Sequence, residues 1–205
     1  MIRLLLSLLM FATTISFGQN AVDIKQKAQA FRDRLIQDRI DTILDYTLEC
    51  IGYYNSEDSC GDFDAHYIFW QKNDKTFLQR IDGCGISKSI FLDVDNPLTF
   101  YINHKKQIDK EIVYPPKYIQ SKDGDTEISI SQSIDHTCYN QFSFLVQRKK
   151  IFKSVSEFNL AFKKFDNGRN NIYYNHNQKT ELKKLNDQTA QLLKQLEANR
   201  KFEVE

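Results

Sequence analysis

The segment 65–82 constrains the fold most, because it has the pattern of a tight β-hairpin with two apolar faces. Two strand-like runs, Ala65 to Lys72 and Lys75 to Asp82, flank the turn pair Asn73-Asp74, and a two-residue turn sets the pairing of the strands around it. The predicted opposite pairs are Trp70 with Phe77, Phe69 with Leu78 and His66 with Ile81. Large apolar side chains then lie on both faces, so we predict that the hairpin lies in the middle of a sheet covered on both sides.

Helical periodicity is found near both ends of the chain. Apolar residues recur at helical spacing from 21 to about 51, which predicts one amphipathic helix that ends at Gly52. A second helix is predicted over 154–165, where Ser154 and Glu157 have the spacing of a capping box. A third begins near Thr180, with a row of residues spaced 3, 4, 3 and 4 apart: Leu182, Leu185, Thr189, Leu192 and Leu196.

Further strands are predicted from alternation and turn signals. They cover 86–94, 98–102, 128–134 and 138–148, the third with one buried face and the fourth as its partner. Asp95-Asn96-Pro97 is interpreted as a turn, and the stretch 103–126 as irregular. The chain is thus predicted to be a single α+β domain over 19–205, with a mainly antiparallel sheet of five to seven strands, one N-terminal helix and two C-terminal helices.

Residues 1–18 have the pattern of an export signal peptide. Arg3 precedes the apolar run Leu4 to Ile15, and Ser16 and Gly18 are small residues at the −3 and −1 positions of a cleavage site. The run is short for a membrane span, and no second apolar stretch follows it. We therefore expect an exported protein, periplasmic or extracellular, with no transmembrane segment in the mature chain.

Four cysteines follow the leader, and an oxidising compartment favours their pairing. Their spacing alone allows three connectivities. The hairpin register favours Cys60 with Cys84, because both flank the open end of the hairpin, and this leaves Cys50 with Cys138. The alternative is a reactive Cys–His site, since His136 and Cys138 would share one face of a strand, but this site requires a free thiol.

Charge is unevenly distributed along the chain. Residues 19–140 contain 14 Lys and Arg against 20 Asp and Glu, whereas 141–205 contain 13 against 7, so the two parts carry −6 and +6. The two charges cancel over residues 19–205, which argues against a nucleic-acid binder. Either the basic C-terminal third packs over the acidic remainder, as we expect, or it offers a basic surface to an anionic partner.

The remaining chemistry-bearing residues form no recognised motif. Two acidic groups lack EF-hand spacing and are interpreted as solvated loops: Glu57, Asp58, Asp62 and Asp64, and Asp123, Asp125 and Glu127. The histidines at 66, 104, 136 and 176 are scattered, and no C-x-x-C, H-E-x-x-H, G-x-S-x-G or phosphate-binding glycine loop occurs. No catalytic residue, metal site or cofactor is therefore predicted.

Two features of the C-terminal third have alternative interpretations. Tyr173 and Tyr174 lie in a polar, Asn-rich segment, where they either stack on a base or sugar or, as we expect, pack onto the edge of the core. The C-terminal leucine row forms either a short coiled-coil seam or, as we expect, a helix docked on its own domain. We accordingly expect a monomer.

The segment His66 to Gly85 resembles a group of small secreted bacterial proteins with no assigned activity. The resemblance rests on Tyr67-Ile68-Phe69-Trp70, Lys75-Thr76-Phe77-Leu78, Asp82-Gly83-Cys84-Gly85 and the later run Asp135-His136-Thr137-Cys138. It implies secretion and brings no catalytic or binding residue with it.

These features favour a non-catalytic binding or interaction protein of the cell envelope or exterior, with an unidentified protein or envelope partner. The alternative is a secreted hydrolase with acidic catalytic residues, since paired carboxylates leave no signature in one sequence.

Overall fold

The computed structural model describes residues 19–51, 65–124 and 126–203. Its main sheet is antiparallel and has seven strands in the order β4-β3-β2-β1-β8-β9, with β5 beside β3. The strands are β1 (Thr42–Ile51), β2 (His66–Lys72), β3 (Lys75–Asp82), β4 (Gly85–Ile86), β5 (Ile90–Leu92), β8 (Thr137–Val146) and β9 (Lys149–Ser156). A separate two-stranded ribbon consists of β6 (Lys117–Asp123) and β7 (Thr126–Ser131). The predicted α+β class and antiparallel sheet are confirmed.

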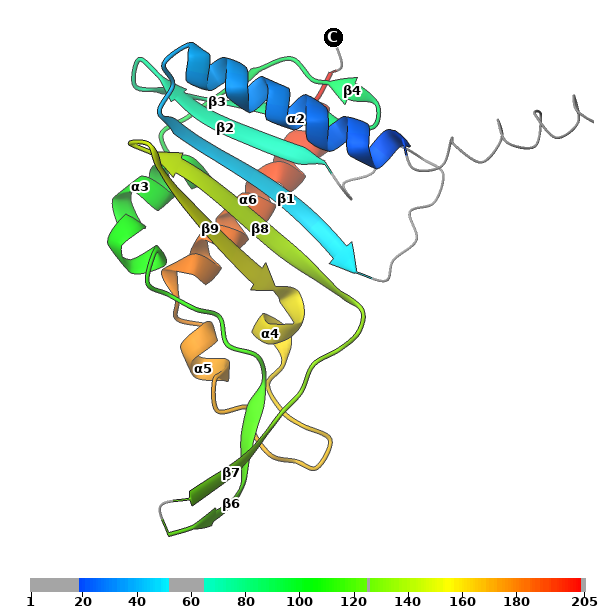
Figure 1. The fold of residues 1–205 in the computed structure, drawn as a ribbon, viewed down its shortest axis with the longest axis vertical. Helices are drawn as coiled ribbons and strands as arrows, with labels where there is room; N and C mark the ends of the chain where they lie inside the picture. The colour runs from blue at the N-terminus through cyan, green and yellow to red at the C-terminus, as the bar shows by residue number, and fades with distance from the viewer. Residues whose placement is uncertain (1–18, 52–64, 125, 204–205) are drawn as a thin grey trace, which may run out of the picture.

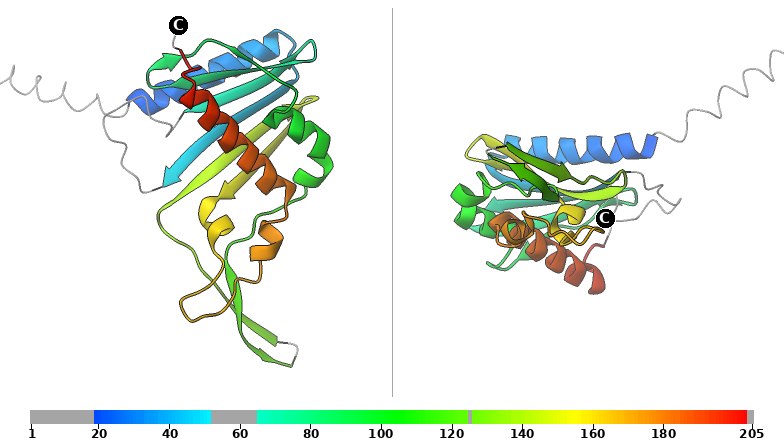
Figure 2. Two further views of the ribbon diagram at one scale, coloured as in Figure 1. Left: turned by 180° about the vertical axis from the view of Figure 1, so that it is seen from behind. Right: turned by 90° about the horizontal axis from the view of Figure 1, so that it is seen from below.

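Helices cover both faces of the sheet. The helices are α2 (Gln19–Gln37), α3 (Pro97–Ile108), α4 (Glu157–Ala161), α5 (Tyr174–Asn177) and α6 (Glu181–Ala198). Figure 2 shows α2 on one face of the sheet and α6 on the other, where α6 crosses the strands from behind. In Figure 1 the β6–β7 ribbon projects from the end of the molecule opposite to α2. Among the described residues, no helix is long and apolar enough to cross a membrane.

The central hairpin has the predicted register. Trp70 lies opposite Phe77, and His66 lies opposite Ile81. The turn residues Asn73 and Asp74 have φ angles of 52° and 59°, which is the left-handed pair that a type I′ turn requires. Both faces of β2 are buried, as predicted, because the strand contributes side chains to a hydrophobic cluster on each side of the sheet.

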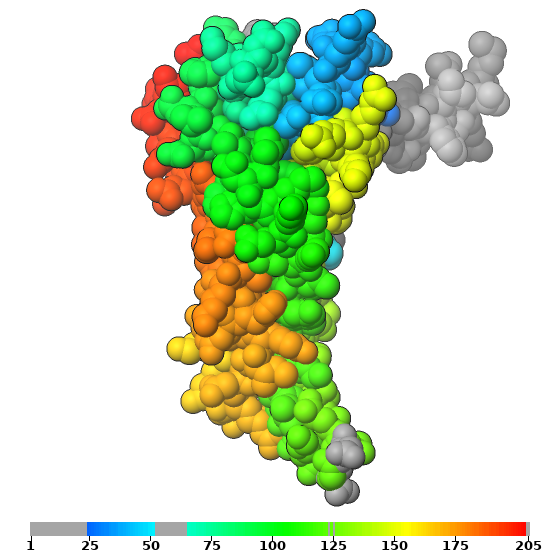
Figure 3. Space-filling model, turned by 90° about the vertical axis from the view of Figure 1, so that its left-hand side faces the viewer, coloured from blue at the N-terminus to red at the C-terminus, as the bar shows by residue number. Residues whose placement is uncertain are grey.

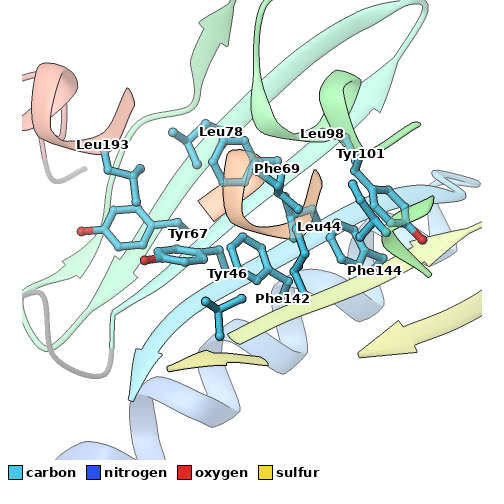
Figure 4. Close-up of a cluster of buried hydrophobic side chains, with 14 of the residues drawn as sticks. Leu44, Tyr46, Tyr67, Phe69, Leu78, Leu98, Tyr101, Phe142, Phe144 and Leu193 are labelled. Atoms are coloured by element: carbon cyan, nitrogen blue, oxygen red, sulfur yellow. The ribbon is translucent and has the colours of Figure 1, made fainter. Parts of the chain in front are cut away.

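Each face of the sheet carries its own hydrophobic cluster. The larger cluster joins the sheet to α3 and α6 and is shown in Figure 4. Its fully buried members include Leu44, Phe69, Leu78, Leu98, Tyr101, Phe142, Phe144, Leu182 and Leu185. The smaller cluster lies under α2 and contains Ile24, Ala28, Leu35, Ile40, Ile43, Ile68, Trp70 and Ile81. This division explains why alternate residues of the hairpin are equally apolar.

The predicted helix over 21–51 is wrong beyond Gln37. The chain leaves the helix at Arg39, whose φ is 63°, and the Ile40 N–H donates to the Leu35 carbonyl at 2.9 Å, which is the hydrogen bond of a Schellman cap. Residues 42–51 then form β1, between β2 and β8. The first half of β1 is buried on both faces, so its apolar residues also fit a helical period. The predicted stop at Gly52 lies outside the described residues.

The predicted strand over 98–102 is also wrong, because this segment belongs to α3. Asn96 is the N-cap, its side chain accepts from the Thr99 N–H at 3.1 Å, and Pro97 occupies the first turn. Asp95-Asn96-Pro97 is therefore a helix start and not a turn between strands. The helix extends to Ile108, so the stretch 103–126 is not wholly irregular, and the run 86–94 contains only the short strands β4 and β5.

The segment 128–134 does not pair with 138–148. Its first part is β7, which pairs only with β6 in the described chain, while β8 pairs with β1 and β9. The predicted buried face of 128–134 is also wrong, since Ile128 is 54% and Ile130 38% exposed. The Phe142, Phe144 and Val146 face of β8 is buried as predicted.

The C-terminal third follows the prediction more closely. Thr180 caps α6 by accepting from the Lys183 N–H at 3.1 Å, and the leucine row packs on the sheet, so the docked helix is confirmed. The earlier helix is shorter than predicted: α4 has five residues, and its N-cap is Ser156 instead of Ser154.

Candidate functional site

One face of the sheet is only partly covered. The helix α2 packs on β2 and β3 and contacts the start of β1 through Ile43 and Asp45, whereas the rest of β1, β8 and β9 carry no helix on that side (Figure 1). Strand alternation and register place Thr47, Gln141, Ser143 and Phe152 on this open face. Phe152 is 60% exposed and lies directly opposite Ser143. The open face is therefore polar, with one large exposed aromatic ring.

A groove runs where α2 meets this open face. Its wall is a stripe of α2 that contains Gln29, Arg32 and Ile36, and its floor is formed by Ile43 of β1 and by Ser143 and Leu145 of β8. Lys150 of β9 lines the outer side of the hollow.

A second, smaller hollow lies along the same helix and strands. It is lined by Lys25, Thr47, Leu48, Glu49, His66 and Gln141. Lys25 lies one helical turn from Gln29, and Gln141 is the next residue after Ser143 on the same face of β8. The two hollows thus lie next to each other along α2 and β8, and we call them together the α2 groove.

A buried polar network lies beneath the α2 groove. The Asp45 side chain is 2% exposed and accepts from Arg32 of α2. It also lies 2.9 Å from Nδ1 of His66 on β2. A buried carboxylate must be paired, and these two partners satisfy Asp45 while tying α2 to the middle of the sheet. With Nδ1–H donated to Asp45, a neutral His66 ring has its lone pair on Nε2.

The lining of the α2 groove suits a polar ligand without strong net charge. Lys25, Lys150 and Arg32 are offset by Asp33, Glu49 and the buried Asp45. Apart from His66, the other polar lining groups are amides and hydroxyls, which both donate and accept hydrogen bonds: Gln29, Thr47, Gln141 and Ser143.

The cysteines bear directly on the predicted sites. Cys50 and Cys138 lie opposite each other on β1 and β8 and form a disulfide, as predicted. This bond removes the thiol that the alternative Cys138–His136 site requires. Cys84 is not a free thiol, but its predicted partner Cys60 lies outside the described residues, so that pairing stays a prediction.

The predicted acidic loops are largely outside the described chain. Glu57, Asp58, Asp62, Asp64 and Asp125 all fall there. Within residues 19–51, 65–124 and 126–203, no group of three or more His, Cys, Asp or Glu side chains is placed to hold a metal ion.

The tyrosine pair of the C-terminal third packs against the protein itself. Tyr173 stacks on Tyr114 with ring centroids 4.7 Å apart, and the Tyr174 ring lies 5.7 Å from the Lys163 ammonium. Both rings are half-buried. The interpretation that they pack onto the edge of the core fits this arrangement.

The C-terminal third packs on the rest of the domain through α6, and several ion pairs join the two parts. Arg80 pairs with Glu197 at 3.5 Å and Lys88 with Glu203 at 3.4 Å. In both pairs the acid comes from the basic C-terminal third. The cations of these two pairs are Arg80 and Lys88, so neither pair uses Lys150 beside the α2 groove.

The α2 groove and its buried network are not predicted from the sequence. There His66 is a hairpin residue and one of four scattered histidines, and Asp45 is part of the predicted helix. A strand over 42–51 places four alternate residues on one face, and most of them are polar: Ile43, Asp45, Thr47 and Glu49. This polar face of a central strand is the sequence signal for the groove.

The chain is thus an α+β protein that has an antiparallel sheet between helices and a polar groove beside α2. No family model, curated protein or solved structure matches the chain.

Proposed function

We propose that the chain is an exported, non-catalytic binding protein of the cell envelope or exterior, and that the α2 groove binds an oligosaccharide. The observation that carries the proposal is the combination of amide and hydroxyl groups in the groove with the exposed ring of Phe152 beside it. Sugars present C–H faces that pack on aromatic rings and hydroxyl groups that hydrogen-bond to amides and carboxylates.

Export is the second part of the proposal. The Cys50–Cys138 disulfide supports it, because such bonds persist in oxidising compartments and are rare in the cytosol. N-terminal sequencing of the protein recovered from an envelope fraction or the medium tests this part. A chain that begins at Gln19 is expected, and an intact leader on cytosolic protein would contradict it.

Binding is tested on an array of envelope oligosaccharides, followed by calorimetric titration with a sugar that the array selects. Phe152→Ala is expected to weaken binding about tenfold, the effect of losing roughly 1.4 kcal/mol of ring contact. Phe91→Ala is the matched control, since Phe91 is 56% and Phe152 60% exposed, and Phe91 lies on β5, away from the groove. Equal effects of the two substitutions, or an array without any bound sugar, would contradict the proposal.

A second candidate function is a secreted hydrolase with acidic catalytic residues. The specific observation in its favour is His66, which lines the smaller hollow together with Glu49 and is oriented by Asp45 through Nδ1. A histidine held in this way acts as a general base toward water. In such an enzyme, His66→Gln would abolish turnover of a bound sugar while leaving its binding intact. Wild-type protein that binds a sugar without cleaving it would exclude this candidate.

A further inference from the structure

The β6–β7 ribbon, formed by β6 and β7, has three isoleucines whose side chains are each more than a third exposed. Ile119 is 39%, Ile128 54% and Ile130 38% exposed. Figure 3 shows that the ribbon projects from one end of the molecule. A two-stranded ribbon is marginal in water by itself, and exposed apolar patches of this kind mark interaction sites.

The outer edge of β6 is occupied near its base. The Lys117 N–H donates to Asn171 Oδ1 at 3.1 Å, and the Ile172 N–H donates to the Lys117 carbonyl at 2.9 Å. Further along, Nη1 of Arg169 donates to the Ile119 carbonyl at 2.8 Å. The segment 169–172 therefore holds the ribbon in one orientation and covers this edge.

The outer edge of β7 is open. The backbone N–H and C=O of Lys117 point away from β7, so in the alternating antiparallel pattern those of Tyr118 point toward Ile130. On β7, the backbone N–H and C=O of Ser129 and Ser131 then point outward, away from β6. In the described part of the chain these outward groups have no hydrogen-bond partner from another segment.

The β7 edge also lacks the usual protection against pairing. Lysine, proline and bulges keep exposed edge strands apart, and β7 has none of them: its only charged residue is Glu127. The edge strand of the main sheet, β9, differs in this respect, since it contains Lys149, Lys150 and Lys153.

We propose that β7 pairs with β7 of a second copy, antiparallel, around a twofold axis at Ser129. In this register Ile128 lies opposite the partner's Ile130, and Glu127 lies opposite the partner's Ser131. Apolar residues then meet apolar residues, and no like charges face each other. The strand is self-complementary, as a twofold interface requires. The self-complementary sequence of β7 favours a second copy of this chain as the strand that pairs with its open edge, in contrast to the monomer expected from the sequence.

The expected dimer is weak. The exposed isoleucines offer an area on the order of a few hundred Å² per copy, which is less than the roughly 800 Å² per partner of a stable complex. About six backbone hydrogen bonds across the axis, two for each of three facing residue pairs, add a modest net contribution. A dissociation constant on the order of 10–100 µM follows.

Sedimentation equilibrium of the purified protein over a range of concentrations tests the dimer. Wild-type protein is expected to shift from monomer to dimer as concentration rises through that range. Ile128→Lys is expected to raise the dissociation constant at least tenfold, because it places ammonium groups beside the axis. Ile112→Lys is the matched control, since Ile112 is 55% exposed and lies outside the ribbon.

Ser129→Pro provides an independent second variant. It removes the N–H that points outward, so the β6–β7 pairing is kept while the pairing of two copies is blocked. The urea midpoints of all variants establish that they are folded. Wild-type protein that stays monomeric above the stated range, or an Ile112→Lys effect equal to that of Ile128→Lys, would overturn the proposal.

Discussion

Loss of the Cys50–Cys138 disulfide should remove a large part of the stability of the domain. The bond joins strands β1 and β8 and closes a loop with a sequence separation of 88 residues. In the chain-entropy account, breaking the bond that closes a loop of this length raises the conformational entropy of the unfolded chain. This lowers the free energy of the unfolded state by about 4.6 kcal/mol at 25 °C. Measured values are typically about 2–4 kcal/mol. Both cysteines are half-buried, so serine leaves little cavity, and the unfolded state carries most of the effect.

The assay is urea unfolding of the Cys50→Ser/Cys138→Ser variant beside the wild type, followed by circular dichroism. With an m-value near 2 kcal/mol per M, a loss of about 3–4 kcal/mol lowers the midpoint by roughly 1.5–2 M. The variant leaves Cys84 unchanged, so the difference reports this bond alone. A midpoint within about 0.2 M of the wild type would refute the reasoning. A lowered midpoint that reducing agent does not reproduce in the wild type would refute it as well.

Three further outcomes follow from buried polar groups. Burial raises the pKa of Tyr101 to about 12, while an unfolded tyrosine ionises near 10. The unfolded chain therefore loses its proton first, and stability should fall between about pH 10 and 12; urea midpoints against pH should show a shallower fall for Tyr101→Phe. Asn177→Ala removes three hydrogen bonds to backbone groups of a fully buried amide, and thermal unfolding should show a loss of about 3 kcal/mol. Thr180→Ala removes the α6 cap and should cost about 1 kcal/mol by urea unfolding; a larger loss than for Asn177→Ala would contradict this ranking.

The central hairpin could be predicted residue by residue because its determinants are local. The turn pair sets the register, and the alternation of β2 and β3 needs no knowledge of distant segments. The α6 helix was predictable for the same reason, since Thr180 and the leucine spacing lie within one segment. The Cys50–Cys138 pairing followed only by elimination, after the hairpin had been assigned.

The start of α3 shows how a correct local signal received the wrong interpretation. Asn96 and Pro97 mark a helix start as well as a turn, and Leu98 to Ile102 is short enough to fit a strand. The choice depends on Leu98 and Tyr101, which are both fully buried against the sheet. Only a helix brings these two residues, three apart, onto one face.

The error at β1 and the omission of the α2 groove have one physical origin. Residues 42–51 alternate between two environments: Leu44 packs toward α6, whereas Asp45 lies under α2 and is paired with Arg32. The first half of β1 is covered on both faces, so its apolar residues no longer distinguish period 2 from period 3.6. The same burial makes Asp45 look like a polar residue on the solvated face of a helix. Once the strand is assigned, the buried carboxylate of Asp45 requires hydrogen-bonding partners. These partners are Arg32 and His66, and His66 lines the groove.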